Sequence, residues 1–306
     1  MRALSHPLKL FRKGKIRDIY DLGDELVIVA SDRVSAYDVT LPDEIPRKGE
    51  SLTNLSTFWF TRTGHIIPNH FLKCENSRSV RVRKADRIDV EWVVRSHLYG
   101  SMWRAYAKGI REYGGMKLPN GLKMAEELPQ IILTPTTKSE IGHDQDISRG
   151  EAIARGLLTG DDWRLLEEAS LELYEFYRDA ARRRGVIIPD FKVEYGRCRG
   201  TLIQIDEPPT HDSARFWAER YYTVGEQQEA HALDKEFLRV FLREWCGFTG
   251  EGPPPRLPQA VIDEVSKRCV GAYEVMSGNM QIEDLHLKSL PQVLQELGGE
   301  GKSPKI

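Results

Sequence analysis

The residues best suited to chemistry lie in one stretch, residues 186–207, which reads VIIPDFKVEYGRCRGTLIQIDE. Its two short runs rich in Val, Ile and Tyr favour strands, which a turn would join as a hairpin. If the turn is centred on Gly200, Glu194 lies directly opposite Asp206, and two facing carboxylates repel each other. A divalent cation such as Mg²⁺ would remove that repulsion. Lys192 shares the face of Glu194 and could reach a phosphate bound to the same cation.

A turn centred on Cys198 is equally compatible with this spacing. It would place Glu194 opposite Leu202 and Asp206 opposite Asp190, near the open end of the hairpin. All of these charges would then be solvated and would form no metal site. Because register depends on the turn geometry as well as on the apolar pattern, the spacing alone leaves both registers open.

A basic turn near the N-terminus is the second candidate. Residues 10–30 read as two strands joined by a turn at residues 22–24, which predicts a hairpin. Ahead of it, Gly14 lies among four cations, which include Lys15 and Arg17. Backbone that can approach a ligand closely therefore lies beside positive charge, a composition that suits a polyphosphate. The alternative is a basic turn on a solvated surface.

Residues 31–60 are crowded with Ser, Asp, Arg and Lys and contain two prolines. We expect a polar loop followed by an amphipathic helix over residues 52–60. Binding groups concentrate in polar loops held by a rigid scaffold. Ser35, Asp38 and Lys48 are therefore candidate ligand contacts, although each of them taken singly fits a surface residue better.

The alternating sequence of residues 80–94 predicts an extension of the antiparallel sheet. Arg95 and Ser101 follow it, just before a helical pattern at residues 102–109. An anion at such a helix start would meet free N–H groups as well as Arg95. The alternative is an N-cap serine with a solvated arginine. Further along, the sequence THDSAR, which ends at Arg215, gives another pair of serine and arginine.

Residues 131–148 form a further polar loop that holds Lys138, His143 and Asp144. The neighbouring histidine and aspartate suggest acid–base chemistry, but no nucleophile elbow is recognisable, so a hydrolase triad is weakly supported. The clearest predicted helix covers residues 162–185, where leucines and aromatic residues recur at helical spacing. Its aromatic stripe is expected to face the core.

The composition restricts the possible partners. The chain has 306 residues, 40% of them hydrophobic and 29% charged, with a net charge of −2 and a pI near 6.5. This balance is ordinary for a globular protein of about two domains, and it offers no overall basic field for nucleic acid or an anionic membrane. Small-molecule partners are therefore expected, and a homo-oligomer stays open.

The compartment is expected to be the cytoplasm. No segment approaches the ~18 consecutive apolar residues of a membrane span, and no apolar core follows the basic N-terminal residues. The four cysteines are widely spaced and form no CxxC pair, so we expect them to be reduced.

Taken together, six blocks of the sequence resemble, in order, those of the phosphoribosylaminoimidazole-succinocarboxamide synthase (SAICAR synthetase) family. The blocks are GKIRDIYDLGDELVIVASDRVSAYD, VEWVVRSHLYGS, LTPTTKSEIGHD, IPDFKVEYG, LIQIDEPPTHDSARFW and GEGPPPRLP. They span nearly the whole chain. The departures are mild: Tyr195 stands where the family usually has Phe, and residues 198–200 replace a variable turn.

The resemblance implies a two-domain α+β fold. Residues 1–94 would form an N-terminal antiparallel lobe like that of protein kinases, and residues 95–306 a larger ATP-grasp-like domain, with ATP in the cleft between them. It also implies a reaction of purine biosynthesis in which ATP, Mg²⁺, L-aspartate and carboxyaminoimidazole ribotide (CAIR) give SAICAR, ADP and phosphate.

The same resemblance implies roles for individual residues. It assigns ATP binding to Gly14, Lys15, Arg17 and Lys192. It assigns magnesium binding to Glu194 and Asp206, and the 5′-phosphate of the ribotide to Arg95, Ser101 and Arg215. Catalytic positions facing the substrates are Lys192, Lys138 and Asp144. Further substrate contacts are Ser35, Asp38 and Lys48.

Two other classes of protein share parts of this pattern. A small-molecule kinase would have a related nucleotide lobe and the same Lys192, Glu194 and Asp206, but not two Arg/Ser sets for a ribotide phosphate. A protein that binds nucleotide without catalysis should have lost one of those three residues, and all three are present. A ligase needs ATP to convert a carboxylate oxygen into a leaving group, and such catalysis rests on positioning and charge neutralisation.

Overall fold

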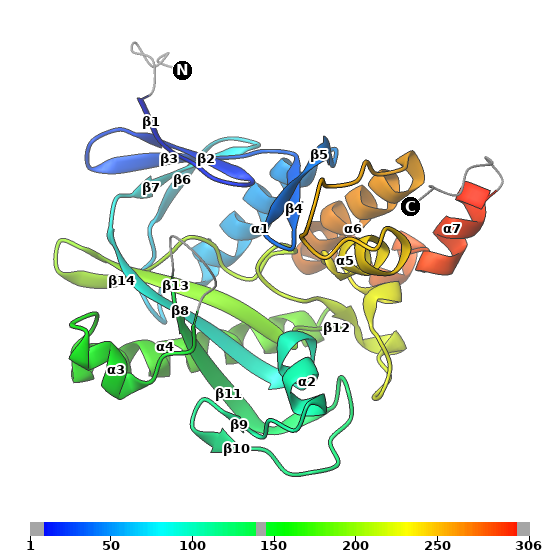
Figure 1. Ribbon diagram of the computed structural model, residues 1–306. Coiled ribbons are helices and arrows are strands. Elements are labelled where there is room, and N and C mark those ends of the chain that lie inside the picture. The colour runs from blue at the N-terminus through cyan, green and yellow to red at the C-terminus, as the bar shows by residue number, and fades with distance from the viewer. Residues whose placement is uncertain (1–8, 139–144, 299–306) are drawn as a thin grey trace.

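The computed structural model describes residues 9–138 and 145–298. The chain has a mixed α+β fold whose two larger sheets are both antiparallel. The five-stranded sheet lies at the top of Figure 1, in the order β1-β2-β3-β7-β6. Its strands are β1 (Lys9–Lys13), β2 (Arg17–Asp21), β3 (Glu25–Ala30), β6 (Phe71–Asn76) and β7 (Ser79–Arg83).

The predicted hairpin of residues 10–30 is confirmed in β2 and β3, which pair around a turn at residues 22–24. Gly23 has a φ of 89°, which favours glycine, and its N–H donates to Asp21 Oδ1 at 2.7 Å. A third strand, β1, pairs back onto β2. The basic turn is therefore the connection between β1 and β2.

A four-stranded central sheet lies below the first sheet in Figure 1. It has the order β11-β8-β13-β14 and consists of β8 (Asp86–His97), β11 (Glu127–Thr137), β13 (Asp190–Cys198) and β14 (Thr201–Ile205). Residues 80–94 form antiparallel strands, as predicted, but they do not extend the same sheet, because β7 belongs to the first sheet and β8 to the second. The chain crosses between the sheets at Lys84 and Ala85, so the expected domain boundary after residue 94 falls inside β8.

The hairpin of β13 and β14 has neither of the two registers considered from the sequence. Cys198 pairs with Thr201 across the two-residue turn Arg199–Gly200, and Glu194 therefore pairs with Ile205. Both turn residues have positive φ, 51° and 83°, as a tight two-residue hairpin turn requires. The prediction that Glu194 lies directly opposite Asp206 is thus wrong by one residue.

The long helix α4 (Gly160–Arg182) confirms the helix predicted over residues 162–185. Thr159 begins it with a capping box, since Thr159 Oγ1 accepts from the N–H of Asp162 and the Asp162 carboxylate accepts from the N–H of Thr159. The helix packs on one face of the central sheet, as predicted for its aromatic stripe. The shared aromatic core includes Trp92, Trp163, Tyr174, Tyr177 and Phe191.

Helix α1 (Lys48–Thr63) begins four residues before the predicted start at residue 52. Its N-cap, Arg47, has a φ of 64° and makes no side-chain cap, so the capping signals that usually mark a helix start are missing from the sequence. The helix packs against α6 (Gln259–Ser277) from the C-terminal part of the chain. Residues far apart in the sequence therefore meet at α1.

The C-terminal helices lie at the right of Figure 1, beside a small two-stranded sheet formed by β4 (Arg33–Ala36) and β5 (Val39–Glu44). Apolar residues of this sheet, among them Val34 and Leu41, share a core with α5 (Glu236–Val240) and α6. The other α-helices and strands are α2 (Gly100–Ala107), β9 (Glu112–Tyr113), β10 (Met116–Lys117), α3 (Arg149–Ala154), β12 (Val186–Ile187), β15 (Trp217–Ala218) and α7 (Leu290–Gly298).

All four cysteines are free thiols. Across the part of the chain that the structure describes, no helix combines the length and the apolar character needed to cross a membrane.

Candidate active site

One face of the central sheet carries nearly all the charge. Because alternate residues of a strand share a face, Glu91, Val93 and Arg95 of β8 lie on one side of the sheet, opposite Glu194, Lys192 and Asp190 of β13 in the antiparallel register. The residues between them pack on the other side against α4. These buried residues are Val90, Trp92, Val94, Phe191, Val193 and Tyr195.

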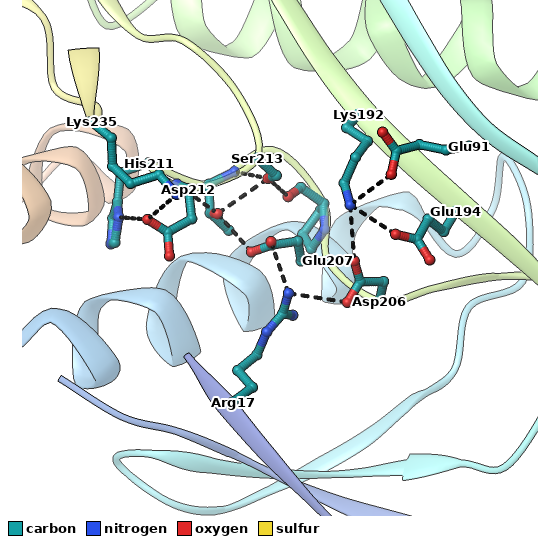
Figure 2. A network of polar contacts seen from close by, with 12 residues as sticks. Arg17, Glu91, Lys192, Glu194, Asp206, Glu207, His211, Asp212, Ser213 and Lys235 are labelled. Atoms are coloured by element: carbon teal, nitrogen blue, oxygen red, sulfur yellow. Dashed lines mark hydrogen bonds and ion pairs between the residues drawn. The ribbon is translucent and has the colours of Figure 1, made fainter. Parts of the chain in front are cut away.

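Lys192 is the centre of a cluster of carboxylates, as Figure 2 shows. Its Nζ lies 2.8 Å from Glu194 Oε1, 3.1 Å from Glu91 Oε2 and 3.5 Å from Asp206 Oδ2. Burial alone would lower the pKa of Lys192, but the charges of these three carboxylates raise it well above its usual value. Lys138 also donates to Glu194 Oε1. The site thus holds two ammonium groups against shared carboxylates.

Glu91 is a site residue that the sequence reasoning missed. It pairs directly with Glu194 in the ladder of β8 and β13, so facing carboxylates do occur, but Asp206 is not one of them. Burial raises the pKa of Glu91, and the charge of Lys192 opposes that change. Its position four residues before Arg95, on the same strand face, is the signal that could have found it.

Asp206 reaches the cluster because its backbone turns directly after β14, with a φ of 62°. Arg17 of the first sheet lies 3.1 Å from Asp206 and 2.9 Å from Glu207 (Figure 2). Burial alone would lower the pKa of Arg17, but these two carboxylates raise it above its usual value. Arg17 therefore joins the first sheet to the end of the central hairpin.

The expectation that Glu194 and Asp206 repel each other without a metal is wrong. Burial alone would raise the pKa of Asp206, but Arg17 and Lys192 outweigh it and lower the pKa well below its usual value. Protein cations therefore already neutralise these carboxylates. The position of Lys192 between Glu194 and Asp206 also shows that the two carboxylates can share one cation.

The basic turn is ordered by its own backbone and by Arg33. The N–H of Gly14 donates to the carbonyl of Arg17 at 2.8 Å, and a Cβ on Gly14 would lie 2.6 Å from the same oxygen. Arg33 donates to the carbonyl oxygens of Gly14 and Lys15. Lys15 pairs with Asp38 at 2.6 Å on the surface. Sequence reasoning missed Arg33, which holds the turn in shape.

Arg95 and Arg215 meet at Asp190, at the other end of the same sheet face. Arg215 Nη1 lies 2.5 Å from Asp190 Oδ2, and Arg95 Nη1 lies 3.9 Å from that oxygen. Arg95 also donates to Thr134 Oγ1. Burial would lower the pKa of Arg215, but Asp190 and other carboxylates raise it above its usual value. Arg215 Nη2 also lies 3.7 Å from Glu236 Oε2. Two guanidinium groups thus converge on this end of the face, held in place by protein carboxylates.

A cavity of about 910 Å³ opens beside this end of the sheet. Arg95, Ser101, Tyr113 and Thr134 contribute to its lining. Ser101 lies in the first turn of α2, which begins two residues before the predicted start at residue 102, and the N-cap is Tyr99, not Ser101. The guanidinium of Arg215 packs against the start of the same helix, since a Cβ on Gly100 would lie 2.5 Å from Arg215 Nη2. The structure therefore brings together the three residues expected at a ribotide phosphate.

Lys48 and Ser35 are each engaged with another part of the protein. Lys48 is completely buried, and its Nζ lies 2.6 Å from Asp212 Oδ2. Lys235 lies 3.3 Å from the other carboxylate oxygen of Asp212. Ser35 pairs with Thr40 in the small sheet. In this structure the Lys48 ammonium faces a protein carboxylate, not an open site.

Four polar residues of this region were not singled out from the sequence: Glu207, His211, Asp212 and Lys235. Burial would raise the pKa of Asp212, but Lys235 and Lys48 lower it well below its usual value. Burial lowers the pKa of His211, and neither of its ring nitrogens has a hydrogen-bond partner in the described part of the chain. A neutral imidazole therefore lies beside a charged carboxylate (Figure 2).

The described residues contain no group of three or more His, Cys, Asp or Glu side chains arranged to hold a metal ion. Mg²⁺ needs less, since one or two protein carboxylates suffice when substrate phosphates complete its shell. Asp144 and His143 lie outside the described residues. Lysine and arginine side chains bind phosphate oxygens well, so this face is suited to an enzyme of phosphorylated substrates.

Comparisons with known proteins identify the family of this chain. The family model described as SAICAR synthetase matches residues 10–253. The phosphoribosylaminoimidazole-succinocarboxamide synthase of Bacteroides fragilis is 40% identical over 277 residues, which cover 89% of this chain and 88% of that protein. The chain belongs to the SAICAR synthetase family. It is an ATP-dependent ligase with SAICAR synthetase activity in de novo purine biosynthesis.

Solved structures agree with this assignment. The SAICAR synthase of Saccharomyces cerevisiae, complexed with SAICAR, superposes with a TM-score of 0.78 at 34% identity, covering 91% of this chain and 97% of that chain. A SAICAR synthetase in complex with ADP matches with a TM-score of 0.64 at 24% identity, covering 85% and 97%. At this lower identity, the second comparison shows only that the two chains share a fold. Family membership favours the ligase over the small-molecule kinase.

Proposed function

We propose that the charged face of the central sheet binds CAIR along its length and that ATP lies between this face and the first sheet. The observation that carries the proposal is the placement of two cationic clusters on one face, Arg95 and Arg215 at one end and Lys192 and Lys138 at the other. Lys192 reaches Glu91 and Glu194, which lie four strand residues from Arg95 and Asp190, a separation of about 13 Å at ~3.3 Å per residue. That span suits a ribotide whose phosphate and carboxylate lie at opposite ends.

The ribotide phosphate is assigned to Arg95, Ser101 and Arg215. Arginine binds phosphate oxygens through two parallel hydrogen bonds, and the N-terminal turn of α2 adds free N–H groups. The Nε of Arg215 is buried and lacks a hydrogen-bond partner among the residues that the structure describes, so its N–H remains available to donate to a ligand. With the phosphate there, the CAIR carboxylate points towards Lys192.

ATP is assigned to the junction of the two sheets. Gly14, Lys15 and Arg17 lie at the edge of the first sheet, and Arg17 contacts Asp206 and Glu207 beneath it. This arrangement supports the finer description of the fold as a kinase-like lobe above an ATP-grasp-like domain. Because the chain leaves the first sheet after Arg83, we place the end of the nucleotide lobe there instead of at residue 94.

Magnesium is assigned to Glu194 and Asp206. Both carboxylates already share one cation, the ammonium of Lys192, and oxygen donors are the ligands that Mg²⁺ prefers. The residues therefore fit the ion. When bound, Mg²⁺ would neutralise charge on the phosphates of ATP.

The reaction we propose begins with transfer of the γ-phosphoryl group of ATP to the CAIR carboxylate, which gives an acyl phosphate and ADP. The amine of L-aspartate then attacks the acyl carbon, and phosphate leaves as the amide forms. Lys192 and Lys138 would hold the transferring phosphoryl group and stabilise its charge. Asp144 remains a proposed catalytic position, and Ser35 and Asp38 remain proposed substrate contacts. Lys48 is not retained as a substrate contact, because its buried ammonium pairs with Asp212.

An omission experiment tests this function. ADP release is measured with ATP, CAIR, L-aspartate and Mg²⁺ together, and then with each component left out in turn. Full activity should require all four, with SAICAR formed in step with ADP. Steady ADP release without aspartate would indicate a kinase and contradict the proposal.

A further inference from the structure

Arg268 of α6 is a fully buried arginine that lies outside the active site. A guanidinium has five N–H donors, and all three of its nitrogens have acceptors here. Nε donates to Glu264 Oε1 at 3.2 Å, and the Phe237 ring lies 4.2 Å from the guanidinium carbon. The other two nitrogens donate, at 2.6 to 3.0 Å, to the carbonyl oxygens of Glu229, Ala230, Ala232 and Lys288.

These contacts indicate that Arg268 holds neighbouring backbone groups in position more than it stabilises the fold. A buried charge is expensive to desolvate, and well-packed apolar residues can often replace it without loss. Four of the acceptors of Arg268 are neutral carbonyls, and Glu264 is its one carboxylate ion-pair partner in the described part of the chain. Burial lowers the pKa of Arg268, against the opposing charge of Glu264. The Arg268 side chain does, however, fix the positions of three carbonyl groups within residues 229–232.

The segment that Arg268 holds leads directly to the arginine of the ribotide site. The N–H of Leu233 donates to the carbonyl of Phe216 at 2.8 Å, and Asp234 Oδ2 accepts from the N–H of Phe216 at 2.8 Å. Glu236 Oε2 then lies 3.7 Å from Arg215 Nη2. Residues 233–236 therefore bind both backbone groups of Phe216 and face the side chain of its neighbour.

We propose that Arg268 is a positioning residue for the ribotide phosphate site, acting on Arg215 through residues 229–236. The inference rests on the proposed function, which assigns Arg215 to the phosphate. Arg215 Nε and Glu236 Oε2 are both buried without a hydrogen-bond partner among the residues described. Arg215 Nη1 donates to Asp190 Oδ2 on one side, and Glu236 faces Nη2 on the other. A small shift of residues 233–236 would therefore turn the guanidinium about its hydrogen bond to Asp190.

The test is Arg268→Lys, which keeps the charge but loses the planar fork that reaches several carbonyls at once. Because small misplacements of a binding group are costly, KM for CAIR should rise about tenfold or more, while KM for ATP should change less than about twofold. A purely structural role would lower the melting temperature without separating the two KM values, and that result would overturn the proposal.

A double-mutant cycle with Arg215→Ala shows whether Arg268 acts through Arg215. If it does, adding Arg268→Lys to Arg215→Ala should raise KM for CAIR by less than about twofold, since coupled residues are not additive. Additive effects would contradict the proposal. Arg164→Lys, an exposed change of the same type on α4, is the matched control and should alter neither KM.

A second variant keeps the proposal testable if Arg268→Lys fails to fold. Glu264→Gln keeps the shape of the main partner of Arg268. It should also raise KM for CAIR more than KM for ATP, but by a smaller factor. KM values equal to those of the unaltered protein would overturn the proposal. Failure of the proposed function is distinguishable, because the unaltered protein would then release no ADP that depends on CAIR and aspartate.

Discussion

At the scale of single residues, the proposed active site is built from cations that protein carboxylates hold in place. Lys192 has three such partners, Arg17 has two, and Arg215 has Asp190 and Glu236. Charges fixed before the substrates arrive need no reorganisation during the reaction. The cost is that an entering phosphate or Mg²⁺ must compete with a protein partner for each group.

Asp206→Asn should show this competition. Losing a proposed metal ligand should lower kcat by about 10- to 100-fold and raise the Mg²⁺ concentration needed for half-maximal rate. The variant should also unfold more easily in magnesium-free buffer, by about 1–3 kcal/mol, because Arg17 and Lys192 lose an ionised partner. A variant with an unchanged Mg²⁺ requirement would show that Asp206 holds Arg17 and Lys192 and is not a metal ligand.

At the scale of secondary structure, two short connections decide the site. The two-residue turn Arg199–Gly200 sets the hairpin register and leaves Asp206 just beyond the last paired residue. The turn between β1 and β2 brings the backbone of Gly14 back onto Arg17. Neither connection can change in length, because shifting the strand register by one residue would move every side chain to the other face of the sheet.

Gly14→Ala tests the basic turn as an element. The added methyl would lie 2.6 Å from the carbonyl oxygen of Arg17, so the backbone must move and the Arg17 side chain with it. We expect KM for ATP to rise by roughly tenfold or more, with KM for CAIR nearly unchanged. Lys13→Ala, on the exposed strand β1, is the control for loss of a nearby cation. Unaltered ATP kinetics in Gly14→Ala would mean that the turn is only surface.

At the scale of the whole molecule, a buried ion cluster connects the N-terminal and C-terminal parts of the chain. Lys48 at the start of α1 and Lys235 just before α5 share the carboxylate of Asp212. Breaking a buried pair leaves an uncompensated charge, which costs about 3–5 kcal/mol. Asp212→Asn should therefore lower the free energy of unfolding at pH 7, as measured by urea denaturation.

The pH dependence of that loss follows from the lowered pKa of Asp212 in the folded protein. Stability from a carboxylate with a depressed pKa is fully present above its unfolded value of about 3.9 and is lost as the pH falls through that value towards the folded pKa. The difference between the unaltered protein and Asp212→Asn should thus shrink as the pH drops from 7 to 3.

The matched control is Asp161→Asn, at a carboxylate whose side chain is 91% exposed. It should change stability little at any pH, since exposed ion pairs contribute about 0–1 kcal/mol. A difference for Asp212→Asn that stays constant down to pH 3 would contradict the assignment of Asp212 as a buried, ionised partner of two lysines.

The sequence by itself determined the family, the helix α4 and the β2–β3 hairpin, and it proposed the cationic residues that lie at both ends of the charged face. Those features depend on local patterns, such as alternation along a strand, helical spacing or glycine in a turn. Lys192, Arg95 and Arg215 could be found because each lies in a short block of characteristic residues.

Tertiary structure alone decided which carboxylates meet. Glu91 faces Glu194 because β8 and β13 pair, although many residues separate them in the chain, and no local pattern records such a pairing. The buried position of Lys48 depends likewise on Asp212 and Lys235, which come from distant segments. Local sequence specifies which way a side chain points from its own strand or helix, whereas its partner is chosen when distant segments pack.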